Sequence, residues 1–277
     1  MTTAAQEIYA IAEAIAPTWE RRRAEVEAAS APVREWMVQE LAARPGDTVL
    51  ELAAGVGDTG FDAAAIVGET GRLISSDFSP AMLAAARRRG AERGIANAEF
   101  RVIDAERIEL DTDSVDGVLC RFGYMLMPDP AKALAETRRV LRPGGRVTLA
   151  VWGALERNPF FAIVGESMAR HGHLPPEPPG APPAFSMAEA EHTAGLLEAA
   201  GFSDVETLDV AVAFAVPDAE GYVSLIADTS GPLGLAVSSL SDADRATLAS
   251  DAARAIAPFA AAEGYAIPGV ALVAAAG

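Results

Sequence analysis

Between Thr48 and Trp152 the sequence alternates short apolar runs with longer amphipathic stretches, and no other feature restricts the fold as much. The apolar runs predict buried strands at 48–53, 72–76, 99–102, 115–121 and 145–152. The stretches between them predict helices at 60–67, 79–93 and 129–140. Strands joined by helices form a parallel sheet, because each connection must return over one face of the sheet. The sequence therefore predicts a doubly wound α/β fold.

The N-terminal residues predict a helical cover for this core. Apolar residues at helical spacing form two stripes within residues 1–45, one around Ile8 to Ile15 and one around Val33 to Leu41. N-terminal helices are therefore expected before the core at 46–152. A turn at Pro45, Gly46 and Asp47 separates the cover from the core.

The residues after 152 predict the rest of the sheet and two insertions. A helix at 188–200 and strands at 205–216 and 267–275 would complete a mostly parallel, seven-stranded sheet within 188–277. The insertions are 153–187, with a proline-rich loop at 174–180, and a helical segment at about 217–263. Such insertions can form a lid over the carboxyl ends of the strands, where open α/β sheets bind ligands. Surface decoration is the alternative.

The charge distribution excludes several classes of partner. The formal net charge is -17, and from residue 158 onward 15 acidic residues face three arginines. A nucleic-acid partner needs a basic surface, so none is expected. The sequence lacks an apolar run of about 18 to 20 residues and a basic, apolar leader, so we expect no membrane span and a cytoplasmic location. The single cysteine, Cys120, cannot form an internal disulfide.

A glycine-rich turn after the first predicted strand points to a bound ligand. Its spacing, Gly55-x-Gly57-x-x-Gly60, lets the backbone turn sharply and approach a ligand closely, and it also fits nicotinamide dinucleotides. Three acids lie at or just after successive strand ends: Glu51, Asp77 and Asp104. Carboxylates there disfavour a ligand rich in phosphate and favour one with cationic groups and a ribose.

Five motifs in this order resemble the class I S-adenosylmethionine-dependent methyltransferases, particularly those of ubiquinone and menaquinone biosynthesis. The motifs are ELAAGVG at 51–57, DFSPAML at 77–83, DAE at 104–106, DGVLCRF at 116–122 and LRPGGR at 141–146. The resemblance covers roughly 42–152. It implies a Rossmann-like fold, S-adenosylmethionine as cofactor and methyl transfer as the activity.

The resemblance also implies a nucleoside end of the cofactor site. Asp77 would accept hydrogen bonds from the ribose hydroxyls, and Phe78 and Met82 would pack against adenine. Asp104 would bind the adenine amino group, and Ala105 would contact the ring through its backbone.

At the methionine end, the resemblance implies contacts from the glycine turn and the fourth strand. The residues are Glu51, Ala53, Gly55 and Gly57 around the methionine portion, with Arg121 and Phe122 beneath the sulfonium.

Methyl transfer depends on aligning the acceptor opposite the sulfur, so a general base is optional. His171 and His173 are the base candidates by chemistry and by their place in the first insertion. The alternative is an exposed or structural His-x-His pair. Two histidines without a cluster of further ligands do not predict a metal site.

Large apolar residues could form the wall of an acceptor pocket and favour a flat, apolar small molecule. They are Trp19, Tyr124, Met125, Met127, Trp152, Phe160, Phe161 and Phe185. Oxygen or carbon methylation is expected, by a monomer or a homodimer. The alternatives are nitrogen or sulfur methylation of a small metabolite, a non-catalytic binder of S-adenosylmethionine and, last, a nicotinamide-dependent oxidoreductase.

Overall fold

The computed structural model describes residues 3–174, 183 and 185–277, and in these residues it contains a seven-stranded sheet. The strands are β1 (Thr48–Glu51), β2 (Arg72–Asp77), β3 (Ala98–Val102), β4 (Val115–Arg121), β5 (Leu141–Trp152), β6 (Glu206–Val216) and β7 (Tyr265–Ala276). Their order across the sheet is β3-β2-β1-β4-β5-β7-β6. β1 to β5 are parallel, and β7 is antiparallel to both of its neighbours. The predicted α/β fold with a mostly parallel, seven-stranded sheet is confirmed.

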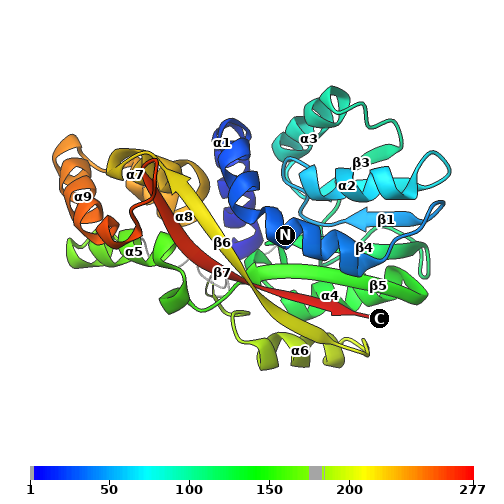
Figure 1. The fold of residues 1–277 in the computed structure, drawn as a ribbon. Helices are drawn as coiled ribbons and strands as arrows, with labels where there is room; N and C mark the ends of the chain where they lie inside the picture. Colours follow the sequence, from blue (N-terminus) through cyan, green and yellow to red (C-terminus); the bar gives the residue numbers. More distant parts are fainter. Residues whose placement is uncertain (1–2, 175–182, 184) are drawn as a thin grey trace.

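Helices connect the parallel strands and cover both faces of the sheet (Figure 1). They are α2 (Asp58–Val67), α3 (Pro80–Glu92), α4 (Pro130–Val140) and, after β5, α6 (Ala190–Ala199). Local sequence explains two of the starts. Ser79 and Asp129 each accept a hydrogen bond from a backbone N–H three residues on, and each precedes a proline in the first turn. The predicted helix bounds lie within two residues of the observed ones.

The predicted N-terminal helices are one continuous helix, because the 39-residue α1 (Thr3–Leu41) spans the region. Pro17 and Pro32 lie inside it. A proline removes one helical hydrogen bond and usually ends or bends a helix. Around Pro32, burial offsets this cost: Val33 and Met37 are fully buried in the main core, with Ala29 and Leu41 on the same face.

β6 and β7 form a long antiparallel ribbon that extends past the rest of the sheet (Figure 1). Residues 271–276 of β7 pair with β5, and residues 265–270 continue beyond the end of β5 with β6 as partner. Helices gather on this part: α5 (Pro159–Arg170), α7 (Ala219–Thr229), α8 (Gly231–Ser238) and α9 (Asp242–Ala255). Phe214 of β6 and Tyr222 of α7 belong to the buried core between them. The predicted proline-rich loop lies almost wholly outside the described residues.

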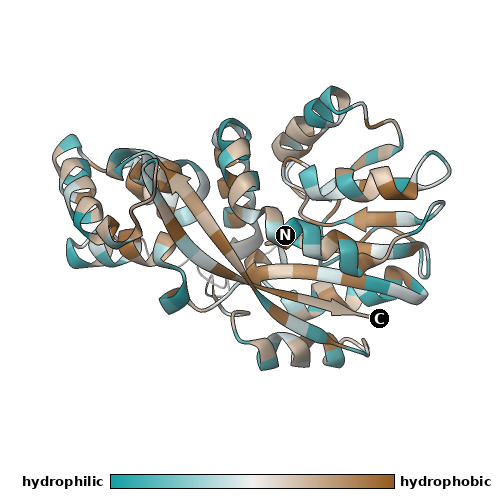
Figure 2. Cartoon of the chain, in the orientation of Figure 1, coloured by the Kyte–Doolittle hydropathy of each residue, from teal (hydrophilic) through white to brown (hydrophobic). Residues whose placement is uncertain are grey.

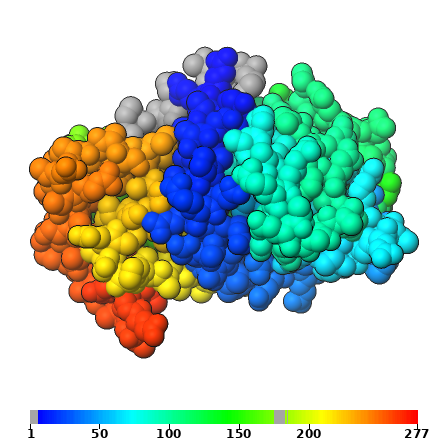
Figure 3. Space-filling view, turned by 90° about the horizontal axis from the view of Figure 1, so that it is seen from above, coloured from blue at the N-terminus to red at the C-terminus, as the bar shows by residue number. Residues whose placement is uncertain are grey.

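α1 lies between the two halves of the molecule and contacts both. It packs against α3 on one side and against α7 and β6 on the other. In the view from above, α1 runs in dark blue between the orange C-terminal helices and the cyan and green helices of the parallel sheet (Figure 3). Figure 2 shows apolar residues along the strands and polar residues on the outer turns of the helices. In the part of the chain that the structure describes, no helix has the length and apolar composition needed to cross a membrane.

Candidate active site at the carboxyl edge of the sheet

The strand order reverses between β1 and β4, and open α/β sheets bind ligands at the carboxyl ends of the strands at such a point. The backbone is unusual there. Ala53, just after β1, and Phe122, just after β4, have φ angles of 50° and 57°. Non-glycine residues in the left-handed region store strain that often accompanies a functional site. Gly123 keeps the two turns in contact, since a Cβ there would lie 2.6 Å from the Cβ of Ala53.

The glycine turn combines an open position with packed ones. Gly55 has a φ of 54°, and a Cβ placed on it would meet no described atom within 4 Å. A Cβ on Gly57 would instead lie 2.6 Å from the Phe61 ring, and one on Gly60 would lie 2.3 Å from the carboxylate of Glu51. Gly55 therefore leaves room for a ligand, while Gly60 is required by the close approach of α2 to β1.

Glu51 points into the protein instead of presenting an open carboxylate. Its two oxygens accept hydrogen bonds from the Gly60 N–H at 2.7 Å and the Ser75 hydroxyl at 3.0 Å, and 3% of the residue is exposed. Burial raises the pKa of Glu51 to about 8, although both hydrogen bonds and the charge of Arg121 oppose the shift. Both oxygens are thus used within the protein, where the side chain holds α2 against β1 and β2. The expected contact of Glu51 with a ligand stays a prediction.

Asp77 ends β2, and its carboxylate connects the glycine turn to the start of α3. It accepts hydrogen bonds from the N–H groups of Gly55 and Ser79, both at 2.9 Å. A carboxylate offers about four acceptor positions, so these two bonds do not exhaust its capacity for further donors such as a ribose diol. Burial, assisted by the charge of Glu13, raises the pKa of Asp77 to about 6, while the backbone hydrogen bonds oppose the shift.

The other residues of the predicted nucleoside end lie beside Asp77. Asp104 is exposed just past β3 and accepts a hydrogen bond from the Glu106 N–H at 2.9 Å. The Ile103 N–H donates to the Asp77 carbonyl oxygen at 3.2 Å, which brings the ends of β2 and β3 together. Phe78 is half-buried, whereas Met82 and Ala105 are buried.

The Arg121 side chain binds two residues of α1. Its guanidinium forms an ion pair with Glu27 of α1 and donates to the Ser30 hydroxyl at 2.7 Å. Glu27 and Ser30 are themselves buried. The place of Arg121 beneath a sulfonium stays a prediction, and the ion pair with Glu27 offsets its positive charge there.

An aromatic cluster lies at the carboxyl ends of β4 and β5. Phe122 stacks on Trp152 with ring centroids 4.2 Å apart and an interplanar angle of 13°. Phe161 of α5 meets the Trp152 ring edge to face at 4.9 Å, and Phe185 contacts Phe161 at 6.0 Å. All four side chains are half-buried. Three of the predicted pocket residues, Trp152, Phe161 and Phe185, thus form one cluster with Phe122.

Other predicted pocket residues belong to the core. Tyr124 is fully buried, and its hydroxyl lies 2.6 Å from that of Thr137. Phe160 is buried and stacks on Phe214 at 3.7 Å, and Met125 is buried with its sulfur 3.3 Å from the backbone nitrogen of Trp152. These three cannot form an open wall. Trp19 is partly exposed on α1, where its Nε1–H donates to the Thr229 carbonyl at 3.1 Å.

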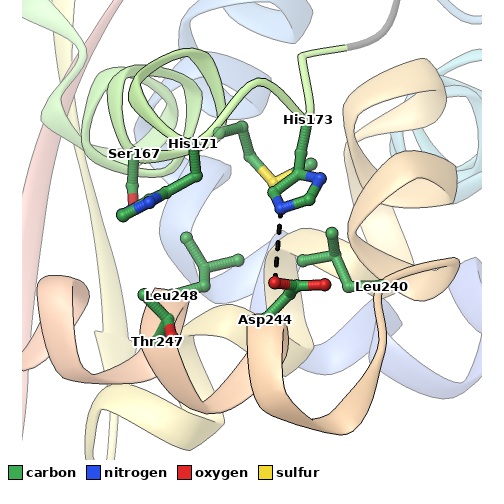
Figure 4. Close-up of a pocket in the computed structure, with 8 residues that line it drawn as sticks. Ser167, His171, His173, Leu240, Asp244, Thr247 and Leu248 are labelled. Carbon is green, nitrogen blue, oxygen red and sulfur yellow. Dashed lines mark ion pairs between the residues drawn. The ribbon is translucent and has the colours of Figure 1, made fainter.

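The structure does not bring His171 and His173 to this edge. Both lie at the end of α5 and face α9, on the side of the molecule away from α2 and α3 (Figures 1 and 4). The Nε2 atom of His171 is 3.0 Å from Asp251, and that of His173 is 3.5 Å from Asp244. Among the described residues, no group of three or more histidine, cysteine, aspartate or glutamate side chains is arranged to hold a metal. These histidines join α5 to α9 and are not placed as bases.

Two acids of α1 that contact the candidate site were not predicted from the sequence. Glu13 contacts the start of α3, and Glu27 pairs with Arg121. Both are separated by more than 60 residues from their partners, so no local motif could indicate the contact. Ser75, which donates to Glu51, was hidden in a strand that the sequence identified only as buried.

Known proteins resemble the part of the chain that carries this geometry. Residues 32–160 match the model of the ubiE/COQ5 methyltransferase family. This segment, just under half of the chain, is similar to the ubiE/COQ5 methyltransferases. The match contains β1 to β5 and all of the acids at the strand ends, and it confirms the resemblance predicted from the sequence.

Individual relatives agree with this assignment. A demethylmenaquinone methyltransferase of Thermus thermophilus is 33% identical over 131 residues, which are 47% of this chain and 52% of that protein. An arsenite methyltransferase of Halobacterium salinarum is 38% identical over 109 residues, which are 39% of this chain and 28% of that protein. The chain thus spans about half, or less, of the length of these relatives.

A solved structure supports the fold of the core. An S-adenosylmethionine-dependent methyltransferase of Aquifex aeolicus superposes with a TM-score of 0.51 at 22% identity, over 67% of this chain and 87% of that one. This likeness concerns the fold. Activity and acceptor must be argued from the site itself.

Proposed function

We propose that the chain binds S-adenosylmethionine at the carboxyl edge of β1 to β4 and transfers its methyl group to a small, flat and largely apolar acceptor. The observation that carries this proposal is the position of Asp77. Its carboxylate is fixed by the Gly55 and Ser79 N–H groups and keeps acceptor capacity for a ribose diol. The open Gly55 and the neighbouring Asp104 extend the same site on either side.

The bound cofactor would supply an activated methyl group on a sulfonium. The protein's contribution is placement and exclusion of water, which in well-oriented reactions amounts to about 7 to 11 kcal/mol. The glycine turn and Asp77 hold the donor side. The cluster of Phe122, Trp152, Phe161 and Phe185 lies at the ends of the next two strands and offers apolar, planar surfaces to an acceptor.

The aromatic cluster favours oxygen or carbon methylation of a ring compound. With the histidines of α5 turned toward α9, the proposal relies on an acceptor that is already nucleophilic, such as a phenolate or a carbon activated by its ring. A small-molecule acceptor also agrees with the net charge of -17, which opposes binding of nucleic acid.

Calorimetric titration with S-adenosylhomocysteine, the demethylated cofactor, tests the proposal. Asp77→Asn should weaken binding by about 1.5 to 3 kcal/mol, the range for hydrogen bonds to a charged group. Asp111→Asn, which changes an exposed acid outside the site, is the matched control and should leave affinity unchanged. Equal affinities in the wild type and the Asp77 variant would show that the ribose is not bound here.

A further inference from the structure

The first turns of α1 differ from the rest of the helix in how they are packed. Between residues 6 and 15 no side chain is buried, although Ile8, Ile11 and Ile15 lie on one helical face. Burial begins at Ala16 and becomes dense from Val26 onward. Three isoleucines left partly exposed on one face indicate a segment whose apolar surface is only partly used in this conformation.

This segment rests directly on the nucleoside end of the candidate site. Glu13 accepts hydrogen bonds from the Ser79 hydroxyl at 2.5 Å and the Ala81 N–H at 3.0 Å. A carboxylate at the first turn of α3 is favoured by the unpaired N–H groups there. Tyr9, one turn earlier, meets the Phe78 ring edge to face at 5.9 Å. The Ser79 N–H donates to Asp77, so one residue contacts both carboxylates.

Pro17 separates this segment from a part of α1 that is firmly attached to α7. The Thr18 hydroxyl donates to the Asp228 carbonyl at 2.8 Å, and the Trp19 indole donates to Thr229. Arg22 forms an ion pair with Asp228 at 2.7 Å. A proline inside a helix lacks one N–H and is a usual place for a helix to bend.

We propose that residues 6–16 form a hinged cover over the nucleoside end of the cofactor site, which Glu13 holds closed by binding the start of α3. The proposal rests on the proposed function for the identity of the ligand. Glu13 is a positioning residue: its hydrogen bonds to Ser79 and Ala81 keep Tyr9 against Phe78. Movement about Pro17 would uncover Phe78 and Asp77 while leaving the attachment to α7 in place.

The chain offers a matched control on the same pair of helices. Glu20 of α1 pairs with Arg88 of α3, with contacts of 3.0 and 2.6 Å, but it lies on the attached side of Pro17. Glu13→Ala and Glu20→Ala therefore each remove one α1 to α3 contact, and only the first removes the one that closes the cover. Alanine is a strong helix former, so neither change should disrupt α1.

Amide hydrogen exchange of the ligand-free protein measures the cover without reference to any cofactor. Glu13→Ala should speed exchange across 6–16 by about 2- to 10-fold, the factor expected for one hydrogen bond. Glu20→Ala should leave exchange in 6–16 unchanged. Equal exchange in the wild type and the Glu13 variant, or equal acceleration in both variants, would overturn the role of Glu13.

The dissociation rate of S-adenosylhomocysteine measures whether the segment covers the ligand. Glu13→Ala should speed dissociation by a similar factor, while Glu20→Ala should not. Unchanged dissociation together with faster exchange would show that Glu13 holds the segment but that the segment does not cover the ligand. Absence of binding to the wild type would reject the proposed function and the covering role, and the exchange experiment would still report on Glu13 separately.

Discussion

At the scale of single residues, the buried Glu51 affects the free energy of unfolding through its ionisation as well as through its contacts. Glu51 is buried with one hydrogen bond to each oxygen, and its pKa is raised to about 8 from 4.5. The folded state therefore binds the Glu51 proton more tightly than the unfolded state. The stabilisation that this protonated side chain contributes is fully present below about pH 4.5. It is lost as the pH rises through 8.

Glu51→Gln tests this cost. The amide can still accept from Gly60 and interact with Ser75, but it cannot ionise. The variant should therefore match the wild type near pH 5 and have a higher free energy of unfolding at pH 8.5. Urea unfolding at the two pH values measures the difference. A difference between variant and wild type that is the same at both pH values would contradict the account.

At the scale of elements, the contact of α5 with α9 gives His171 and His173 a structural role that requires no part in catalysis. Asp251 of α9 receives hydrogen bonds from Ser167 and His171, with Arg170 and Arg254 beside it. These groups hold the pKa of Asp251 below its usual value, chiefly through the Ser167 hydroxyl and His171. The charged partners Arg170, His171 and Arg254 are exposed, so each pair contributes little stability.

Replacing both histidines should therefore affect stability and not ligand binding. The double variant His171→Ala, His173→Ala should lose up to about 1 kcal/mol of unfolding free energy, the range for exposed ion pairs. Its affinity for S-adenosylhomocysteine should equal that of the wild type. His192→Ala, on the exposed side of α6, controls for loss of a histidine. Weaker cofactor binding in the double variant, but not in the His192 variant, would show that His171 or His173 contributes to the cofactor site.

The elements of the core could be predicted because their signals are local. Ser79-Pro80 and Asp129-Pro130 mark helix starts, and the apolar runs of β1, β2 and β4 mark buried strands. α1 could not be predicted as one helix. Its continuity through Pro32 depends on Val33 and Met37 packing on a core built mostly by later residues. The three strand-end acids were predicted, but the inward turn of Glu51 depends on Ser75 and Gly60.

At the scale of the whole molecule, α1 joins the segment that matches the family model to a second group of helices. Thr18 and Trp19 contact residues 210 positions away in α7, while Glu13 and Glu20 contact α3. The sequence predicts a helical cover, but its partners are set by the tertiary arrangement. The matched family core ends at residue 160, so the helices that α1 reaches on the β6–β7 ribbon belong to the part of the chain outside the match.

Thermal unfolding with S-adenosylmethionine, S-adenosylhomocysteine and NADH in parallel tests the central claim most directly. A ligand at 100 times its dissociation constant adds about 2.7 kcal/mol, which for a chain of this size raises the midpoint by about 5 to 10 °C. We expect both adenosyl compounds to raise the midpoint and NADH to leave it unchanged. A shift with NADH alone, or with none of the three, would contradict the assignment of Asp77 and the glycine turn to S-adenosylmethionine.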